Sequence, residues 1–477
     1  MSWLQDRVAG VLAGAAVGDA LGGATEGWTP EQIEERHGGR VTGIVGPFLP
    51  DWRTARPIAP YHKGDGHVTD DTLMTHALVE VYATRRSHLT AHHMASDLVP
   101  LMIGERRWVP ELEDEALILQ RVFLAEKWLV AKLHYGHADP RESGVGNVVN
   151  CGATMYMAPV GLVNLGDPAA AYAEAIDLAG AHQSSYGREA AGVFAAAVAA
   201  ACAPDATVAE VLTACRHLAK DGTAAAIEAV LAAAEKFRAT GGSDDPRELN
   251  RVLRAAVAPY DTVGEAYRAP AMDARLPSRT KSIEELPVAL GLVAAHDGDL
   301  RAAVLDAVNY GRDSDSIATM AGAICGGLGG RAAVPSEWLT EVTRASKLDL
   351  DAVVDSMTET VQAVAADDAR RAADDTRRRA QLAAEDARRM ADEARASAVA
   401  FADAAEEPVR TWAPWVAAGA DVLVGALLWR RSGRSRRAGE PMSAGAKVVR
   451  GVSVALFAAA AANVAGAVLD GRRRSEG

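Results

Sequence analysis

Residues 69–79 read TDDTLMTHALV, and residues 313–324 read DSDSIATMAGAI. Each stretch places two acids and two hydroxyl residues ahead of apolar residues at helical spacing, which predicts a helix beginning at each acidic cluster. The polar side chains of the two clusters offer only oxygen ligands, and these suit Mg²⁺ or Mn²⁺ better than Zn²⁺. Four converging carboxylates would repel one another strongly without cations. We therefore predict that the fold brings the two clusters together around divalent cations.

The N-terminal segment is predicted to form a buried helix. Its glycines recur every fourth residue, at Gly10, Gly14, Gly18 and Gly22. This spacing puts them on one helix face, where the missing side chains let a second helix approach closely. A ridge of this kind also occurs in membrane helices, but the charges of Asp6, Arg7 and Asp19 favour a helix inside a soluble domain.

The composition favours an all-α fold. Of the 477 residues, 49% are apolar but only 5% are aromatic, which is typical of closely packed helices. Residues 1–350 alternate helical periodicity with breaks rich in Gly, Pro and Asp, and they contain no convincing strand pattern. Residues 168–238 are rich in alanine and predict packed helical hairpins. Residues 38–68 are rich in Gly, Pro and His and predict a long surface loop before the first acidic cluster.

Charge and cysteine content exclude some classes of protein. The formal net charge is -13, which argues against nucleic-acid binding. The cysteines have neither a CxxC motif nor the spacing of a disulfide framework, and they are Cys151, Cys202, Cys215 and Cys325. The N-terminus lacks the cationic region and apolar core of a secretory signal. We therefore expect a cytoplasmic protein.

The composition changes near residue 355. Acidic pairs followed closely by arginines begin at Asp367, Asp374, Glu385 and Asp392. An acid three or four residues before a base stabilises a helix by about 0.2–0.5 kcal/mol per pair. Few large apolar residues accompany these pairs, so a sustained coiled-coil seam is not indicated. We predict a first domain over residues 1–350, a charged helical spacer over 355–407 and a C-terminal tail over 408–477.

The tail contains two apolar segments, residues 412–429 and 452–469, and each is followed by a run of arginines. Each is close to the length of roughly 17–20 residues that a membrane-spanning helix needs. Asp421 in the first segment and the abundance of alanine in the second argue against insertion. Two interpretations stay open: a tail attached to the inner face of the membrane, and a helical hairpin or partner-binding segment.

Further motifs lie around the two acidic clusters, at residues 18–26 (GDALGGATE), 152–159 (GATMYMAP), 182–187 (HQSSYG) and 311–318 (GRDSDSIA). In this order and at this spacing they resemble the ADP-ribosylglycohydrolase family, which includes the dinitrogenase-reductase-activating and ADP-ribosyl-acceptor hydrolases. The resemblance covers roughly residues 5–335. It implies an all-α orthogonal helical bundle that holds two divalent cations, Mg²⁺ or Mn²⁺, in a cleft. The implied metal ligands are Thr69, Asp70, Asp71, Asp313, Asp315 and Ser316.

The resemblance also implies catalytic and substrate-binding residues. Glu26 matches a glutamate that lies beside the metals in parts of the family, and the implied catalytic set is Glu26, Asp70 and Asp315. Hydrolysis of a riboside passes through a state of oxocarbenium character, and a carboxylate stabilises this state or activates the attacking water. The implied contacts to pyrophosphate and ribose are Gly152, Ala153, Thr154, Met155, His182, Ser184, Ser185 and Gly187.

Three positions depart from the family's pattern. Ser316 stands where threonine is usual, which keeps a hydroxyl ligand. Cys151 stands where asparagine is common, and Tyr156 stands where arginine is common, so a planar cation is missing from an anion-binding site. We predict a metal-dependent hydrolase that cleaves an ADP-ribosyl bond on a protein side chain or a small molecule. The alternatives are a ribosidase acting on nucleosides or small metabolites, and a non-catalytic scaffold that binds ADP-ribose.

Overall fold

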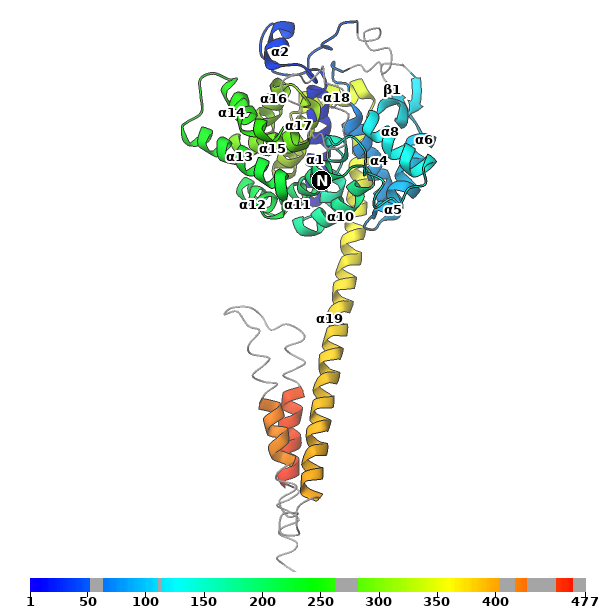
Figure 1. Cartoon of the computed structure of the whole chain (residues 1–477), viewed down its shortest axis with the longest axis vertical. Coiled ribbons are helices and arrows are strands. Elements are labelled where there is room, and N and C mark those ends of the chain that lie inside the picture. The colour runs from blue at the N-terminus through cyan, green and yellow to red at the C-terminus, as the bar shows by residue number, and fades with distance from the viewer. Residues whose placement is uncertain (52–62, 110–113, 262–281, 404–416, 427–451, 466–477) are drawn as a thin grey trace, which may run out of the picture. The chain divides into compact units, whose positions relative to one another are not determined.

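The computed structural model describes residues 1–51, 63–109, 114–261, 282–403, 417–426 and 452–465, and these are predominantly helical (Figure 1). The helices are α1 (Trp3–Gly22), α2 (Pro30–His37), α4 (Asp70–Arg85), α5 (Ala91–His93), α6 (Val99–Gly104), α7 (Ile118–Arg121), α8 (Leu124–Val130), α9 (Ala158–Val163), α10 (Pro168–Gly180), α11 (Ser185–Ala201), α12 (Val208–Leu218), α13 (Asp221–Ala239), α14 (Glu248–Val257), α15 (Ser282–Ala295), α16 (Leu300–Tyr310), α17 (Ser314–Gly329), α18 (Ser336–Ser346) and α19 (Leu350–Asp403). Short π- or 3₁₀-helical turns are η1 (Met94–Leu98), η2 (Ala131–Tyr135), η3 (Cys151–Ala153), η4 (Ala258–Tyr260) and η6 (Arg331–Ala333). The predicted all-α class is confirmed.

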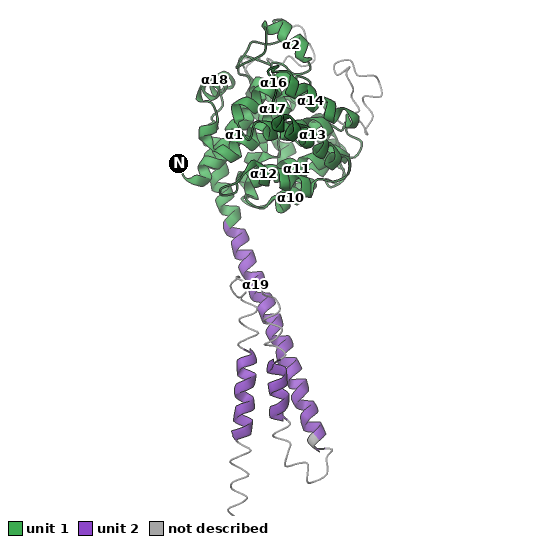
Figure 2. Ribbon diagram, turned by 90° about the vertical axis from the view of Figure 1, so that its left-hand side faces the viewer, with its two compact units in different colours: residues 1–365 green, residues 366–477 purple. Residues whose placement is uncertain are grey.

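The chain forms two compact units, residues 1–365 and 366–477 (Figure 2). The first unit contains one continuous hydrophobic core, to which helices from α1 to the beginning of α19 contribute. α19 itself begins in the first unit and continues into the second. The acidic clusters of the sequence both lie in the first unit, at the beginnings of α4 and α17.

α1 and α17 pack against each other in opposite directions. A Cβ at Gly10 would overlap the carbonyl oxygen of Gly326, and a Cβ at Gly22 would overlap that of Ser314. The two glycines between them lie equally close to the backbone of α17. The close approach predicted from the glycine spacing is therefore confirmed. Because the helices are antiparallel, the C-terminal end of α1 lies beside the N-terminal end of α17, where one acidic cluster begins.

Two charged residues near the start of α1 bind the C-terminal end of α17. The guanidinium of Arg7 donates to the carbonyl oxygen of Gly327, at 3.2 Å, near the C-terminal end of α17. The carboxylate of Asp6 accepts a hydrogen bond from the backbone N–H of Arg331, also at 3.2 Å. Helix carbonyls left without an intrahelical partner thus gain a cationic donor. The expectation that these charges belong to a buried helix of a folded domain agrees with this arrangement.

The alanine-rich region folds as predicted, into successive helices α10, α11, α12 and α13 that pack on one another (Figure 1). Most of α11 is buried, and its buried face is built almost wholly from alanine, glycine and valine. Small side chains let neighbouring helices approach closely without cavities. α11 of this region also packs against η3.

One feature of the secondary structure differs from the sequence-based prediction. Residues 106–109 and 114–117 form a two-stranded antiparallel sheet, β1 (Arg106–Val109) and β2 (Asp114–Leu117), in which Arg106 pairs with Leu117. No convincing strand pattern was identified in residues 1–350. Each strand has four residues and two of them are charged in β1, so no apolar alternation identifies the hairpin.

The second unit contains the charged part of α19 and two further helical stretches, residues 417–426 and 452–465. Acid–arginine pairs at the predicted spacing line the exposed surface of α19, as in Asp367–Arg371, whose charged atoms are 2.6 Å apart. Such exposed pairs contribute little each, about 0.3–0.5 kcal/mol.

The prediction of membrane-spanning helices in the tail is corrected. No helix among the described residues is long and apolar enough to cross a membrane. Instead, the described part of the second segment packs Leu456 against Ala387 of α19. Asp421 of the first segment is buried and lies 3.4 Å from the guanidinium of Arg395. Val424 and Val452 pack against the same small cluster, whereas Leu423 and Val454 are exposed. The remaining parts of 412–429 and 452–469 lie outside the described residues.

Candidate metal centre

Asp19 joins α1 to the first acidic cluster. Its side chain is 0% exposed, and its two oxygens accept hydrogen bonds from the backbone N–H of Thr69, each at 2.9 Å, and from that of Thr72, at 3.0 Å. The hydroxyls of Thr69, at 2.6 Å, and of Thr72 also donate to it. Asp19, rather than the capping residue Thr69, therefore accepts the hydrogen bond from the N–H of Thr72 in the first turn of α4.

The sequence analysis did not identify Asp19 as a site residue. The available signal was a carboxylate that follows the apolar, glycine-rich stretch of residues 8–18, because a charge in such surroundings is buried only when it has donors around it. Burial raises the pKa of Asp19 to about 7, against the lowering effect of the hydrogen bonds from Thr69 and Thr72. The nearby carboxylate of Asp315 raises this pKa further.

The two acidic clusters meet at the junction of α1, α4 and α17. Ligand atoms of Asp19, Asp71 and Asp315 all lie within 4.8 Å of one another. Ligand atoms of Glu26, Asp313 and Asp315 form a second group of the same size. The hydroxyl oxygen of Thr69 lies 3.3 Å from an oxygen of Asp71 and 3.5 Å from one of Asp315. Antiparallel packing places the start of α17 beside the end of α1, and the hydrogen bonds of Asp19 hold the start of α4 at the same place.

The carboxylates of this group are in an unfavourable electrostatic state without a cation. Burial raises the pKa of Asp71 well above its ordinary value, and the charges of Asp315, Asp19, Asp70 and Asp313 raise it further. Burial also raises the pKa of Asp70, although Lys63 opposes this shift. The Oδ1 atom of Asp71 is buried and has no hydrogen-bond partner among the described residues. A set of buried oxygen donors with surplus negative charge fits divalent cations such as Mg²⁺ or Mn²⁺.

Neither acidic cluster uses its first residue to cap its own helix. Thr69 precedes α4 and Asp313 precedes α17, and neither side chain accepts a hydrogen bond from the first turn of the helix that follows. An ordinary capping residue would do so. The hydroxyl of Thr69 instead donates to Asp19, and the carboxylate of Asp313 accepts from the thiol of Cys151. An ordinary capping role therefore does not account for these two residues.

Lys63 is a second residue that the sequence analysis missed. Its ammonium pairs with Glu26 and lies 3.4 Å from a carboxylate oxygen of Asp315. It also lies over the ring of Phe123, 5.1 Å from the ring centre. A flexible cation in this position balances part of the surplus negative charge. It sits in the predicted long loop, and part of that loop, residues 52–62, lies outside the described residues.

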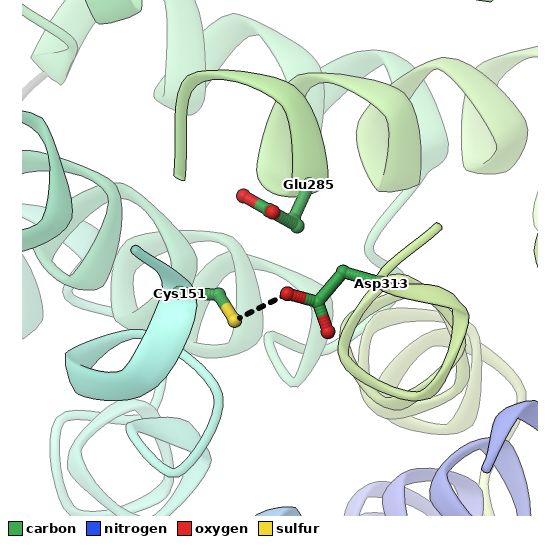
Figure 3. Close-up of side chains that lie close together, drawn as sticks. All are labelled: Cys151, Glu285 and Asp313. Atoms are coloured by element: carbon green, nitrogen blue, oxygen red, sulfur yellow. Dashed lines mark hydrogen bonds between the residues drawn. The ribbon is translucent and has the colours of Figure 1, made fainter. Parts of the chain in front are cut away.

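Cys151, Glu285 and Asp313 form a third group of potential ligands (Figure 3). The thiol of Cys151 donates to Asp313 Oδ2 at 3.2 Å and lies 3.2 Å from the hydroxyl of Ser316. Burial raises the pKa of Cys151 well above its ordinary value, so its sulfur carries a proton when no metal is bound. Glu285 comes from α15, and nothing in its sequence context had marked it as a site residue.

The loop expected to cradle a pyrophosphate uses its own N–H groups internally. The N–H of Gly152 donates to the side chain of Asn150 at 3.0 Å, and that of Ala153 donates to Gln183 at 3.1 Å. The next two N–H groups, of Thr154 and Met155, both donate to the carbonyl oxygen of Cys151. In this arrangement Gln183 and Asn150 fix the shape of the loop, and these four N–H groups are not free for a ligand.

His182 is completely enclosed, and so is the tyrosine beside it. Nδ1 of His182 lies 3.0 Å from the hydroxyl of Tyr156, and Nε2 lies 3.5 Å from a carboxylate oxygen of Glu126. Burial lowers the pKa of His182 to about 4, so the ring is neutral near pH 7. Burial raises the pKa of Glu126 to about 8, with a further rise caused by Asp70. Tyr156 therefore binds His182 and does not face the solvent.

The remaining expected substrate contacts lie at the beginning of α11. Ser185 is exposed and Ser184 is half-buried. Gly187 is buried, where a Cβ would approach a side-chain oxygen of Gln183 to 2.5 Å. The hydroxyl of Thr154 donates to the carbonyl oxygen of Gly187 at 3.2 Å. The two segments are thus held together, and the two serines are the expected contacts that solvent reaches.

Comparisons with known proteins identify the family to which the chain belongs. The chain is similar to the uncharacterised protein YegU of Escherichia coli (strain K12), with 24% identity over 355 residues, or 72% of this chain and 94% of that protein. The model of the family described as ADP-ribosylglycohydrolase matches residues 2–367, which hold every residue of the acidic group. This match covers well over half of the chain, and the protein belongs to the ADP-ribosylglycohydrolase family.

Proposed function

We propose that the chain is a metal-dependent hydrolase that cleaves the glycosidic bond between an ADP-ribosyl group and a protein side chain or small molecule. Membership of the family supports a glycohydrolase of the ADP-ribosyl type. The observation that carries the proposal is the convergence of Asp71, Asp313 and Asp315 with Glu26 at one buried junction. Carboxylates around a reacting sugar are what hydrolysis through an oxocarbenium-like state requires.

The cations would be held by the six residues implied at the sequence level, Thr69, Asp70, Asp71, Asp313, Asp315 and Ser316. Two divalent ions there would supply contacts to a ribose diol and to the attacking water. Of these residues, Asp70 and Asp315 are also proposed to act in catalysis. The ligand chemistry supports Mg²⁺ or Mn²⁺ as the proposed ions, because oxygen donors of this kind favour them.

Glu26 is proposed to act directly on the reacting atoms. Its carboxylate lies within 4.8 Å of ligand atoms of Asp313 and Asp315. From that position it either accepts a proton from water or stabilises the positive charge that develops on the ribose. Lys63, which pairs with Glu26, holds the carboxylate in place.

His182 is proposed as a positioning residue rather than as a direct contact to phosphate. The ring is neutral near pH 7 and enclosed between Tyr156 and Glu126, so it offers no positive charge to an anion. Its position fixes the segment that carries Ser184 and Ser185, and these two hydroxyls are the proposed contacts to substrate. Gly152, Ala153, Thr154 and Met155 are proposed to shape the wall of the site.

A second candidate function is a ribosidase that acts on nucleosides or small metabolites. The internal use of the N–H groups of residues 152–155 favours it, because a pyrophosphate then finds no backbone donors at this loop among the described residues. The buried Tyr156, where the family often has arginine, removes a cation from the same region. We propose that activity belongs to residues 1–350 and that residues 355–407 are a charged helical spacer. A cytoplasmic location stays a prediction from the sequence.

The test uses the purified full-length chain with Mg²⁺ or Mn²⁺. Release of free ADP-ribose is measured from arginine-linked, serine-linked and nucleotide-linked substrates, beside release of ribose from a nucleoside. Turnover of an ADP-ribosyl substrate that stops when the metal is chelated supports the proposal. Turnover of the nucleoside alone supports the second candidate. Binding of ADP-ribose without turnover of any substrate contradicts both and identifies a scaffold.

A matched pair of variants tests the role of Glu26. Glu26→Gln keeps the shape of the side chain but removes its charge and basicity, so turnover should fall by about 10²–10⁴-fold. ADP-ribose binding should change little, because the amide still fills the position. Glu31→Gln, at an exposed position in the first turn of α2, should keep full activity. Full activity in Glu26→Gln would remove this residue from the mechanism.

A further inference from the structure

The acidic junction has one side that contains sulfur. Cys151 comes from η3, Glu285 from α15 and Asp313 from the residue before α17, so three separate elements converge on one point (Figure 3). The implied Mg²⁺ or Mn²⁺ ligands include Asp313 but neither Cys151 nor Glu285. These two residues are therefore left without a role in the proposed function.

The three side chains have the spacing of a small metal site. Their ligand atoms all lie within 4.8 Å of one another, and the Cys151 sulfur lies 3.2 Å from Asp313 Oδ2. A tetrahedral Zn²⁺ with bonds of about 2.3 Å to sulfur and about 2.0 Å to oxygen places neighbouring donors on the order of 3.5 Å apart. The hydroxyl of Ser316, 3.2 Å from the same sulfur, supplies a fourth donor. Small side-chain movements would complete the coordination.

The surroundings also favour a cation at this point. Cys151 is 4% exposed and Glu285 is 0% exposed, so water contributes little to solvating charge there. Asp71, which is 2% exposed, acts electrostatically on the Cys151 thiol, and its Oδ1 atom has no hydrogen-bond partner among the described residues. Buried carboxylates at such distances repel one another, and a divalent cation offsets that repulsion.

The sulfur of Cys151 changes which cation the group of Cys151, Glu285 and Asp313 prefers. Thiolate is a soft ligand that favours Zn²⁺ and related ions, whereas Mg²⁺ requires oxygen ligands in near-ideal octahedral geometry. The sequence-level conclusion that the site disfavours Zn²⁺ was drawn from the two acidic clusters alone. It did not include Cys151, because nothing in the sequence places residue 151 beside residue 313.

We propose that Cys151, Glu285 and Asp313 form a cation site that binds a thiophilic divalent ion, Zn²⁺ or Cd²⁺, in preference to Mg²⁺. The site shares Asp313 with the proposed oxygen-ligand set, and in that respect it rests on the proposed function. On binding, the S–H bond of Cys151 breaks, the proton passes to the solvent and a sulfur lone pair binds the metal. Because Asp313 serves both sets, a thiophilic ion here competes with Mg²⁺ for that carboxylate.

Cd²⁺ is the probe, because a cadmium–thiolate bond absorbs in the near ultraviolet and a cadmium–carboxylate bond does not. Cd²⁺ is titrated into the metal-free, full-length protein, and the expected result is a single absorption band that saturates at one ion per chain. Zn²⁺ should remove the band, and a large excess of Mg²⁺ should not. No band in the wild-type protein, or removal of the band by the excess of Mg²⁺, would overturn the proposal.

Variants assign the band to its residues. Cys151→Ser should lose the band, while Cys325→Ser, which removes another buried thiol outside the group, should keep it. Persistence of the band in Cys151→Ser would overturn the assignment. Glu285→Gln should weaken Cd²⁺ binding by at least about tenfold while the band still forms at saturation. This second variant keeps the test decisive if circular dichroism shows that Cys151→Ser does not fold.

One further variant separates this site from the proposed hydrolase. Asp315 is outside the sulfur-containing group, so Asp315→Ala should keep the cadmium band although it loses hydrolysis. Loss of the band in Asp315→Ala would show that the two sets are one site and would overturn the proposal. A band in a wild-type protein that hydrolyses no ribosyl substrate would refute the proposed function and leave the cation site standing.

Discussion

Gly18 of α1 lies directly against the backbone of Ala318 in α17, so close that a Cβ at residue 18 would overlap the carbonyl oxygen of Ala318. The next residue along α1 is Asp19, which binds the start of α4. The contact between the two helices therefore also sets the distance between the two acidic clusters. An added methyl group at this contact should therefore change both the stability of the protein and the geometry of the candidate metal centre.

Gly18→Ala should destabilise the protein. The added methyl group forces α1 and α17 apart, at a cost of about 1–3 kcal/mol, which exceeds the helix-propensity gain of about 0.5–1 kcal/mol. Urea unfolding followed by circular dichroism measures the change. Gly104→Ala is the control, because a Cβ there has no neighbour within 4 Å, and it should change stability by less than about 1 kcal/mol. Equal stability of the two variants would contradict the close contact.

Asp315→Ala should remove one bound Mn²⁺ and most of the activity while the helical fold is kept. Asp315 lies in the first turn of α17, among carboxylates that we propose to hold divalent cations, so its loss should remove a ligand rather than core packing. Asp351→Ala removes an acid from the first turn of α19 and serves as the control. Titration calorimetry measures stoichiometry and affinity. Unchanged Mn²⁺ binding by Asp315→Ala would refute its role as a ligand.

Asp19→Asn should lower both stability and metal affinity. The carboxylate accepts hydrogen bonds from Thr69 and Thr72 with both oxygens, and an amide offers only one acceptor. A buried donor left without its acceptor costs about 1–3 kcal/mol. Asp355→Asn is the control, because that side chain is exposed and accepts a single hydrogen bond from Gln5. If both variants unfold at the same urea concentration as the wild type, Asp19 does not organise the start of α4.

The sequence predicts the parts of the site that local patterns encode. The glycine spacing of α1 predicts a close helix contact because residues four apart share a helix face, and that contact is present with α17. The two acidic clusters were identified as possible ligands because each combines acids and hydroxyls ahead of a helical pattern. The two clusters meet because α1 packs antiparallel to α17 and because Asp19 of α1 binds the start of α4, and local spacing alone specifies neither contact.

The missed residues depend on tertiary structure. Lys63 precedes the first acidic cluster in a loop, and its contact with Asp315 joins residues 252 positions apart. Glu285 lies in an apolar helical pattern in which a carboxylate appears solvent-facing until α15 is placed against η3 (Figure 3). Tyr156 stands where the family commonly has arginine, and its hydroxyl lies 3.0 Å from Nδ1 of His182 in the interior. Tertiary packing decides where such side chains point, and the periodicity of the sequence does not reveal it.

His182 should make stability depend on pH. Its pKa is about 4 in the folded protein and about 6.5 when unfolded, so between these values the unfolded chain binds more protons and stability falls as pH falls. Glu126 has the opposite effect. Its folded pKa is about 8, so the folded chain keeps a proton that the unfolded chain loses, and stability falls as pH rises from about 4.5 toward 8. The opposite effects of His182 and Glu126 on stability partly cancel in the pH range where both act.

Comparing His182→Asn with the wild type isolates the histidine, because Glu126 is present in both. At pH 7.5 the wild type should be the more stable protein, since His182 keeps its contact with Tyr156. As pH falls from about 6.5 to about 5, the wild type should lose on the order of 2 kcal/mol relative to the variant. Urea unfolding at the two pH values measures the difference. His217→Asn, at an exposed histidine, should show the same stability difference at both. A difference that does not change with pH for His182→Asn would show that the ring is not held neutral by burial.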